Sequence, residues 1–383
     1  MRSEAEETEQ LMLDAVDKFL LKIKPSVREL EANDEYPEEI VAEMKEMGLF
    51  GAVIDPQYGG LGLPVSTYAK IVERVACVWM SLTGVFNSHL IMSMSVQRFG
   101  TAEQKAKWLP LFASGEIRGA LALTEPNCGT DLQAIRTVSK RDGDDYIING
   151  SKAWITNSLH GSCFALLVKT DPDAKPAHKG MSLFIAPKGE GFVMGSKHKK
   201  LGYKGIDTAE FFLDNYRLPA ENLIGLEEGH GLQHALGALA LGRINVASRG
   251  IGVALAALND SIEYSQQRKT FGKPICQHQS IQIYLADMAT RVEAARLLVQ
   301  SAAKAFDRGE RCDMEAGMAK LFATEAAMSN SSEALRIHGA YGYSTEFNVE
   351  RYYRDAPLLA IGEGTNELQR IIIAKQLIEQ NPI

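Results

Sequence analysis

The residues best suited to chemistry lie near the end of the chain, in the segment Ile361–Arg370, which reads IGEGTNELQR. An acid, Glu363, stands between Gly362 and Gly364 directly before a strongly helical run. Glycines let the backbone turn sharply and let a flat ligand come close. A carboxylate held there suits a base that removes a proton from a C–H bond. The alternative is that Glu363 only complements the dipole of the following helix.

The bulk properties of the chain are those of a folded protein with more than one domain. At 383 residues, two or three domains are expected. A net charge of -7 argues against a nucleic-acid-binding surface, although a local basic patch for a phosphorylated ligand stays compatible with it. Because we find no continuous apolar run of about 18 residues, no membrane span is expected.

The cysteines and the first residues indicate where such a chain would work. The five cysteines are far apart and form no C-x-x-C pair, so we expect neither a metal cluster nor a disulfide framework, and a reducing compartment. The first residues are acidic and amphipathic, unlike a signal peptide or an Arg-rich transit peptide.

The hydrophobic pattern divides the chain into a helical part, a sheet part and a second helical part. Between them, short apolar runs separated by turn signals such as Asn149-Gly150 predict an all-β domain. After it, three stretches are long enough for a helix bundle, namely Leu232–Gln266, Ser280–Asp307 and Met314–Ile337. We therefore predict an α+β protein with an N-terminal helical domain (1–118), a central antiparallel β-barrel-like domain (119–225) and a C-terminal four-helix-bundle domain (226–383).

Five motifs occur in order along these three parts. They are Leu123–Asp131, Asn149–Asn157, Arg268–Ile275, Ile337–Tyr343 and Ile361–Arg370. Together they resemble the acyl-CoA dehydrogenase family of flavoproteins, and the similarity spans essentially the whole chain. The resemblance implies an FAD bound between the β domain and the C-terminal bundle, with its isoalloxazine ring facing the acyl chain of an acyl-CoA thioester.

The resemblance implies a first group of FAD contacts from the β domain. Leu121, Thr124, Thr130 and Thr156 match positions that bind the flavin, and Thr130 replaces a serine that is common there. Small hydroxyls can bond the flavin edge without bulk. Trp154 would offer a flat apolar face to the ring, although taken alone it could equally be a core residue.

A second implied group surrounds Arg268, which resembles an arginine that reaches the FAD pyrophosphate across a subunit boundary. Its guanidinium can bind two phosphate oxygens at once. The neighbours that match cofactor positions of the family are Phe271, His278, Gln279, Arg336, Gly339 and Ala340. Taken alone, Arg268 would only end a solvated helix. Because Arg336 replaces a frequent glutamine and Ala340 a glycine, we expect the FAD site to be retained with altered contacts on its adenine side.

A third implied group lies around Glu363, which matches the base of the family. Gly364, Thr365 and Glu367 match positions beside the cofactor. The backbone N–H of Glu363, with a flavin ribityl hydroxyl, would polarise the thioester carbonyl, and desolvation should raise the pKa of its carboxyl group. Some family members place the base on the first long bundle helix, where this chain has Gly242, which cannot act.

For the substrate, the resemblance implies contacts from Thr130, His178, Arg243, Gly362 and Gly364. His178 lies in a loop that could equally be an ordinary exposed turn.

The shape of the acyl group follows from what is missing. Gly362 replaces a bulky tyrosine of several relatives, which predicts room for a branched or cyclic acyl group. Residues 75–97 contain no Lys or Arg, which argues against a dicarboxylic substrate. We therefore expect a short or medium monocarboxylic acyl group.

The sequence thus predicts an FAD-dependent acyl-CoA dehydrogenase that forms the 2-enoyl-CoA and passes electrons to electron-transferring flavoprotein. The resemblance further implies a homotetramer, a dimer of dimers, with no metal, nucleic-acid or membrane partner. It implies a cytoplasmic location, or the mitochondrial matrix for a processed eukaryotic chain. The alternatives are an acyl-CoA oxidase-type flavoenzyme that uses oxygen and a flavin-free binding or scaffold relative, which the set of retained cofactor motifs disfavours.

Overall fold

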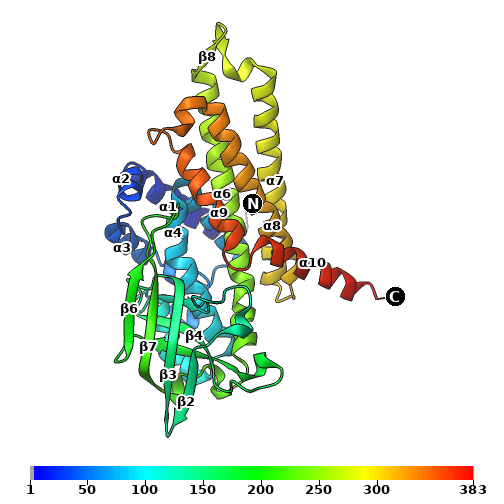
Figure 1. Ribbon diagram of the computed structural model, residues 1–383. Helices are drawn as coiled ribbons and strands as arrows, with labels where there is room; N and C mark the ends of the chain where they lie inside the picture. Colours follow the sequence, from blue (N-terminus) through cyan, green and yellow to red (C-terminus); the bar gives the residue numbers. More distant parts are fainter. Residues whose placement is uncertain (1–3, 383) are drawn as a thin grey trace.

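The computed structural model describes residues 4–382, with helices in the first and last parts of the chain and strands between them (Figure 1). The first part contains α1 (Glu4–Ile23), α2 (Val27–Ala32), α3 (Glu38–Glu46), α4 (Val65–Phe99) and α5 (Ala102–Ala113). The strands are β1 (Gly119–Ala122), β2 (Val138–Asp142), β3 (Asp145–Thr156), β4 (Cys163–Lys169), β5 (Met181–Pro187), β6 (Phe192–Lys197) and β7 (Thr208–Pro219). The last part contains α6 (Gly231–Gln267), the hairpin of β8 (Lys269–Thr270) and β9 (Lys273–Pro274), α7 (Gln279–Asp307), α8 (Asp313–His338), α9 (Val349–Ile361) and α10 (Asn366–Gln380).

The strands β1 to β7 form one curled sheet with the order β1-β4-β2-β3-β7-β6, and β5 pairs with β4. The predicted α+β class is confirmed, but the sheet is mixed rather than fully antiparallel. β4 runs parallel to β1, with Gly119 opposite Cys163, and parallel to β2, with Val138 opposite Lys169. These pairings arise because the β2–β3 hairpin separates β1 from β4 in the chain, so that β4 returns between β1 and β2 in their direction.

One face of the sheet carries its own apolar core. Phe164, Phe184 and Phe211, from three different strands, are fully buried in it. Burying such a side chain is worth about 1.5–3 kcal/mol. Strands β4 and β5 are buried on both faces, and their other side chains join the core shared with the helices. The division of the chain at residues 118 and 225 stays our proposal.

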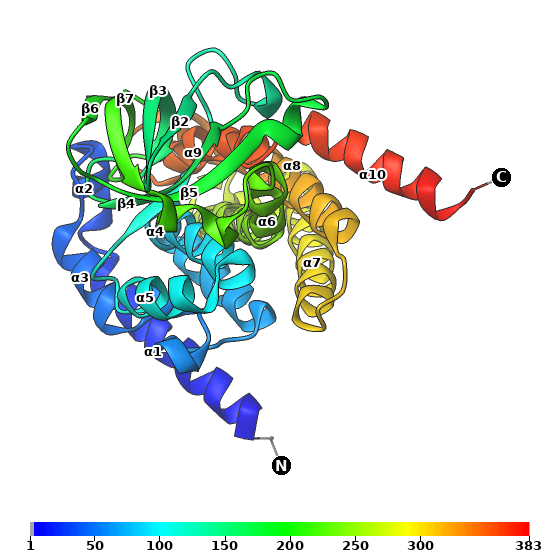
Figure 2. The ribbon, with the colours of Figure 1, turned by 90° about the horizontal axis from the view of Figure 1, so that it is seen from below.

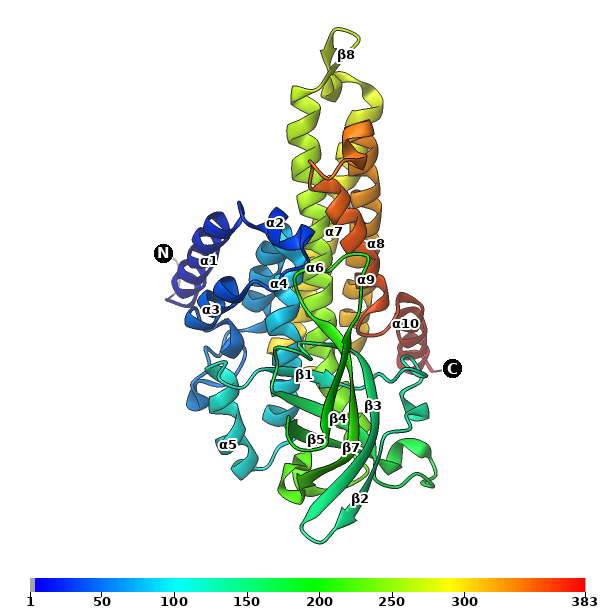
Figure 3. The same ribbon diagram turned by 60° about the vertical axis from the view of Figure 1, so that its left-hand side comes forward.

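Helix α6 is the axis of the helical part. A Cβ added at Gly250 would lie 2.7 Å from Ala323 O of α8, and one at Gly252 would lie 2.5 Å from Glu73 O of α4. The glycines therefore let α6 pack backbone to backbone with α8 on one side and with α4 on the other. Figures 1 and 3 show α6, α7, α8 and α9 running side by side, as a bundle should.

Helix α4 is buried at the centre of the molecule. By length and composition it could cross a membrane, but 83% of its most apolar window is buried within the fold, as in a central helix of a folded domain. It is not straight, because Trp79 has a non-helical φ of -154° and ψ of 102°. The kink packs against Gly205, where a Cβ would lie 2.2 Å from the indole ring of Trp79.

The sheet is attached to these helices at the end of β3. It packs on α4 and α6 (Figure 2). The side-chain amide of Asn157 donates to Val85 O of α4 at 2.8 Å and to Gly119 O of β1 at 3.2 Å. The end of β3 is thereby fixed against the second half of α4.

Candidate active site

Glu363 lies in the short connection between α9, which ends at Ile361, and α10, which begins at Asn366. The φ angles of Glu363 and Gly364 are +54° and +91°, in the left-handed region, whereas Gly362 has an ordinary φ of -68°. The acid and the glycine after it make the turn, which corrects the expectation that both glycines do so. Because a left-handed non-glycine residue costs about 1–3 kcal/mol, the surroundings must hold Glu363 there.

A buried lysine on α8 holds this turn. The Nζ of Lys320 donates to Ala360 O at 3.2 Å, to Gly364 O at 2.8 Å and to Asn366 Oδ1 at 2.9 Å. These bonds grip the chain on both sides of Glu363. Burial lowers the pKa of Lys320 to about 8, and the neighbouring Glu363 carboxylate acts in the opposite direction.

The helix-dipole interpretation applies to another residue. Thr365 caps α10 by accepting a hydrogen bond from Leu368 N at 3.3 Å, and Glu367 lies in the first helical turn. Hydrogen bonds from its own backbone N–H and from the Thr365 side chain lower the pKa of Glu367. Glu363 precedes the cap, and its carboxylate bonds Asn87 of α4, so the alternative role describes Glu367 better.

The carboxylate of Glu363 is buried between α4 and α6. Its Oε1 accepts a hydrogen bond from Nδ2 of Asn87 at 2.9 Å, while its Oε2 is buried without a hydrogen-bond partner among residues 4–382. A Cβ built on Gly242 would lie 2.0 Å from Oε2 and 2.8 Å from Ile91 Cδ1. Gly242 is therefore not only a position without a base. Because it has no side chain, it leaves the space that the Glu363 carboxylate occupies.

Opposing effects set the proton affinity of Glu363. Burial raises the pKa of Glu363 above its usual value, as the sequence predicts. The charge of Arg249, the hydrogen bond from Asn87 and the charges of Lys320 and Arg243 act against this effect, in that order. A carboxylate whose pKa is raised is a better proton acceptor near neutral pH.

Trp154 and Thr156 bring the end of β3 to the same region. Trp154 has a φ of +61°, its side chain is 58% exposed, and it stacks on His198 with ring centres 4.2 Å apart. An exposed ring of this kind is not a core residue, so that alternative is wrong. Thr156 lies beside Tyr203, whose hydroxyl accepts from the Arg249 guanidinium at 3.4 Å and so joins the polar groups around the buried carboxylate.

The other β-domain residues predicted to contact the cofactor follow β1 or belong to it. Leu121 and Thr124 are half-buried and Thr130 is exposed. Ala153 N donates to Thr124 O at 2.9 Å, so the segment after β1 lies along the strand that carries Trp154. The structure thus places Thr124 next to the exposed indole.

The predicted pyrophosphate and adenine contacts lie at the far end of the bundle (Figure 3). Tyr264, near the end of α6, stacks on His338, the last residue of α8, with ring centres 4.2 Å apart. The guanidinium of Arg268 lies 6.0 Å from the ring of Tyr341. These contacts gather the ends of α6 and α8 into one tip, which carries Arg268, Phe271, His278, Gln279, Arg336, Gly339 and Ala340.

One chain does not bring this tip to its own Glu363. Gly242 contacts Glu363, and α6 rises about 1.5 Å per residue, so Arg268 lies about 39 Å further along the helix. Phe271 is 96% exposed there.

The predicted substrate contacts are only partly assembled. Arg243 is buried, its Nη1 lies 3.3 Å from Asp313 Oδ1, and its Nε has no partner among the described residues. His178 is exposed on the 3-10 turn Ala177–Gly180, and no contact links it to Glu363 in residues 4–382.

The surroundings of Glu363 also carry positive charge that lies outside residues 75–97. Residues 75–97 contain no Lys or Arg, but Arg243 and Arg249 of α6 and Lys320 of α8 lie close enough to lower the pKa of Glu363. The absence of Lys and Arg from residues 75–97 therefore does not leave the site without cations.

Sequence reasoning missed the polar groups around Glu363, namely Tyr68, Asn87, Asn245, Arg249 and Lys320. Each is buried in a long helix of the fold. Asn245 and Arg249 stand four positions apart on α6, and that spacing on an otherwise apolar face was the available signal. Asn87 gave no local signal, because its partner lies 276 positions away.

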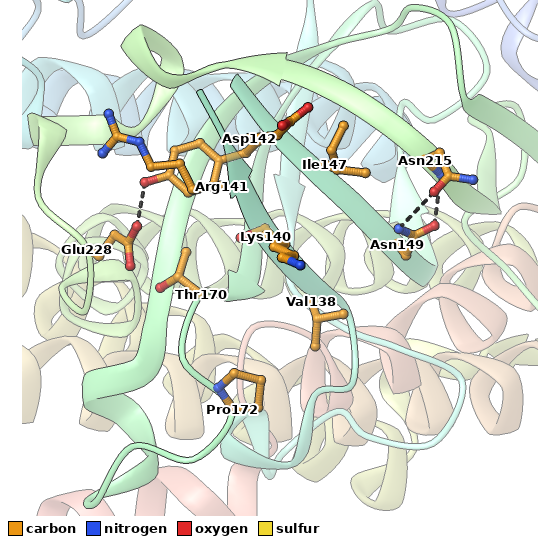
Figure 4. A pocket seen from close by; sticks show the side chains of 12 residues that line it. Val138, Lys140, Arg141, Asp142, Ile147, Asn149, Thr170, Pro172, Asn215 and Glu228 are labelled. Carbon is orange, nitrogen blue, oxygen red and sulfur yellow. Dashed lines mark hydrogen bonds between the residues drawn. The ribbon is translucent and has the colours of Figure 1, made fainter. Parts of the chain in front are cut away.

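A separate cavity of about 820 Å³ lies on the β domain (Figure 4). Lys140, Arg141 and Tyr146 line it together with Thr170 and Glu228, and neither Glu363 nor a side chain in contact with it takes part. The cavity adjoins the start of the loop that carries His178, and it is separate from the candidate base.

Comparisons with known proteins agree along the whole chain. Three family descriptions match: the N-terminal domain of acyl-CoA dehydrogenase at residues 6–116, the middle domain at 120–216 and the C-terminal domain at 229–378. The chain is 40% identical to an acyl-CoA dehydrogenase of Bacillus subtilis (strain 168), over 93% of this chain and 94% of that protein. The butyryl-CoA dehydrogenase of Megasphaera elsdenii has a similar structure, with a TM-score of 0.94, 36% identity and 99% coverage of both chains. A chain from work on the electron transferring flavoprotein of Acidaminococcus fermentans also gives a TM-score of 0.94, 36% identity and 99% coverage of both chains.

The contact between Gly242 and Glu363 can be tested by stability. Glycine to alanine inside a helix normally stabilises by roughly 0.5–1 kcal/mol. Here the new methyl group would stand 2.0 Å from Oε2, so we expect Gly242→Ala to destabilise instead. Overpacking of this kind costs about 1–3 kcal/mol and should lower the midpoint of thermal unfolding.

The matched control adds Gly242→Ala to a Glu363→Ala background, which removes the contact with Oε2 and leaves only the contact with Ile91 Cδ1, the end of a flexible side chain. There the alanine should cost clearly less stability than it does in the wild type. If Gly242→Ala is as stable as the wild type, the carboxylate does not lie against α6.

Proposed function

This chain belongs to the acyl-CoA dehydrogenase family, an oxidoreductase family that acts on acyl-CoA, and we propose that it desaturates a monocarboxylic acyl-CoA to the 2-enoyl-CoA with Glu363 as the base. The observation that carries the proposal is the state of the Glu363 carboxylate. One oxygen is held by Asn87, and the other is buried with no partner among residues 4–382. That second oxygen is the one that can accept a proton.

The family is a flavoprotein family, and residues of this chain fit an FAD. The exposed ring of Trp154 gives a flat apolar surface on the β domain, with the hydroxyls of Thr124 and Thr156 close by. We propose that these side chains hold the isoalloxazine. When bound, FAD supplies the acceptor for a hydride and hence the redox chemistry.

The residues of this chain then carry the proton chemistry. Glu363 removes the α-proton on Oε2 while the β-hydrogen leaves with its electron pair, and the electrons of the broken α-C–H bond form the new double bond. The thioester carbonyl must be polarised for this step. The N–H of Glu363 has no acceptor among residues 4–382. It is oriented by the left-handed turn and can serve that role.

We propose that each cofactor site is completed by a second copy of the chain. Support comes from the separation between the Arg268 tip and Glu363, because a ligand held near Trp154 cannot use the tip of its own bundle. A dimer that exchanges these tips, and a tetramer built from two such dimers, would be closed and symmetric.

We propose electron-transferring flavoprotein as the electron acceptor. The support is the similarity to a chain from work on such a protein in Acidaminococcus fermentans. The cellular location, and the absence of membrane, nucleic-acid and metal partners, stay predictions.

We propose an acyl group that is wide near its α-carbon. A Cβ at Gly362 would meet only Leu358 O, at 3.3 Å, within 4 Å. Because the φ of Gly362 is ordinary, the backbone conformation does not require a glycine there, and Leu358 O is the one close neighbour. The missing side chain therefore counts as free space next to the base.

Glu363→Gln should retain FAD but bleach the flavin with acyl-CoA more slowly by several orders of magnitude, measured anaerobically. General-base catalysis alone supplies about 10²–10⁴-fold, and the proposed reaction has no other base. Glu379→Gln is the matched control, since Glu379 is exposed near the end of α10. A Glu363→Gln variant that bleaches at the wild-type rate would exclude Glu363 as the base.

Mixed dimers can test the shared site. Glu363→Gln and Arg268→Ala should each inactivate their homodimer. In a mixed dimer of the two variants, one site receives an intact Glu363 from one chain and an intact Arg268 from the other, so activity should return. If both residues serve the same chain, every site carries one defect and the mixture stays inactive.

Gly362→Tyr should reduce kcat/KM for isobutyryl-CoA and cyclohexanecarboxyl-CoA much more than for butyryl-CoA. One methylene changes binding by only about 1–3 kcal/mol in an apolar pocket, so neighbouring straight-chain lengths should overlap in activity. Gly362→Ala is the small control. Unchanged rates with the wide substrates, or a preference of the wild type for glutaryl-CoA, would contradict this pocket argument.

A further inference from the structure

A line of buried polar side chains leads from Glu363 into the contact between α4 and α6. Asn87, Tyr68 and Asn245 have no solvent-exposed surface, and Arg249 is 4% exposed. Polar groups in such a place are costly unless they are hydrogen-bonded. Their number within one helix pair requires a reason.

The hydrogen bonds of this line are continuous. Nε of Arg249 donates to Asn245 Oδ1 at 2.6 Å, and Nδ2 of Asn245 donates to the Tyr68 hydroxyl oxygen at 2.7 Å. The Tyr68 hydroxyl donates to Asn87 Oδ1 at 3.4 Å, and Nδ2 of Asn87 donates to Glu363 Oε1 at 2.9 Å. The line thus joins a guanidinium to the carboxylate.

The two ends of the line fix the direction of every bond. A guanidinium can only donate, so Asn245 must turn its carbonyl oxygen to Arg249 and its NH₂ group to Tyr68. The Tyr68 oxygen therefore accepts, and its hydrogen is left for Asn87. An ionised carboxylate can only accept, so Asn87 turns its NH₂ group to Glu363. Every donor points toward the carboxylate.

Given that Glu363 is the base of the proposed reaction, we propose that Asn87, Tyr68, Asn245 and Arg249 are its positioning residues. They form a one-way hydrogen-bond relay, in which every donor points toward the carboxylate. The relay holds Oε1 and leaves Oε2 free for the α-proton. Through it the buried positive charge of Arg249 stabilises the ionised carboxylate. Aligned hydrogen bonds in a buried site polarise one another, so the relay acts as a unit.

The relay opposes the effect of burial on the pKa of Glu363. Burial raises the pKa of Glu363, and the first two opposing causes are the charge of Arg249 and the hydrogen bond of Asn87, the two ends of the relay. The other ionisable groups that face Glu363 are Tyr68 of α4, Tyr203 of the β6–β7 connection, Arg243 of α6 and Lys320 of α8. Because the relay stabilises the ionised form, breaking it should raise the pKa of Glu363, and the base should then become active only at higher pH.

Tyr68→Phe breaks the relay in its middle. It removes one hydroxyl, keeps the ring that packs edge-on against Phe86 with centres 6.0 Å apart, and leaves Arg249 in place. We expect the pKa of Glu363 to rise by roughly 0.5 to 1, the effect of losing a support of ordinary hydrogen-bond strength. Tyr216→Phe is the matched control, because its hydroxyl is bonded to Pro187 O at 2.6 Å within the sheet, away from the relay.

Two readouts are needed on the purified flavoprotein. The first is the pH dependence of kcat/KM with butyryl-CoA. The second is an infrared titration without substrate, which follows the carboxyl band that Glu363→Gln removes. The second readout needs no turnover, so it tests the relay independently of the proposed reaction. If the relay exists but the proposed reaction is wrong, the infrared band still shifts while kcat/KM gives no signal.

Arg249 supplies a second test if Tyr68→Phe does not fold. Arg249→Met should raise the pKa of Glu363 further than Tyr68→Phe does, and Arg249→Lys should restore part of it. Adding Tyr68→Phe to Arg249→Met should change little, since the relay has already lost its charged end. If Tyr68→Phe shifts the pKa no more than Tyr216→Phe, or if Arg249→Met leaves it unchanged, the relay does not exist.

Discussion

The burial of one carboxylate is the constraint on which the rest of the site depends. Removing an ionised carboxyl group from water costs several kcal/mol unless other groups stabilise it. The fold places Glu363 against the bare backbone of α6 at Gly242, and then surrounds it with donors and cations from three helices. The buried side chains of Asn87 in α4, Arg249 in α6 and Lys320 in α8 share this cause. Helices that evolved only for packing would not carry Asn87 or Lys320 at zero exposure.

The architecture follows from the need to bring distant segments to that carboxylate. Glycines on α6 let it touch α4 and α8 at backbone distance, so side chains of all three helices can reach one point. Asn157 fixes the end of β3 to α4, which brings the sheet and its exposed Trp154 to the same place. Lys320 of α8 and Gln369 of α10 both donate to Gly364 O, and these bonds help to hold the acid in a strained left-handed conformation.

The sequence was informative where a signal is local. The pattern predicted the three long bundle helices to within one or two residues, and the motif around Glu363 singled out the acid whose carboxylate is buried. Prediction from the sequence failed where a feature depends on residues far away in the chain. Two parallel strand pairings, of β4 with β1 and with β2, replaced the predicted antiparallel ones. Asn87 became visible only through Glu363, because nothing within α4 shows why an amide lies there.

The same rigidity that fixes the base separates the two halves of the proposed cofactor site. α6 is a continuous helix from Gly242 to Gln267, so its tip cannot fold back to its own Glu363. The tip also carries aromatic rings that the chain leaves uncovered, with Phe271 96% and Tyr343 93% exposed. Covering a side chain such as Phe271 is worth about 1.5–3 kcal/mol, which favours a protein partner at the tip. In the proposed dimer, the contact that covers these rings is also the contact that completes the grip on the cofactor, so assembly and cofactor binding would stabilise each other.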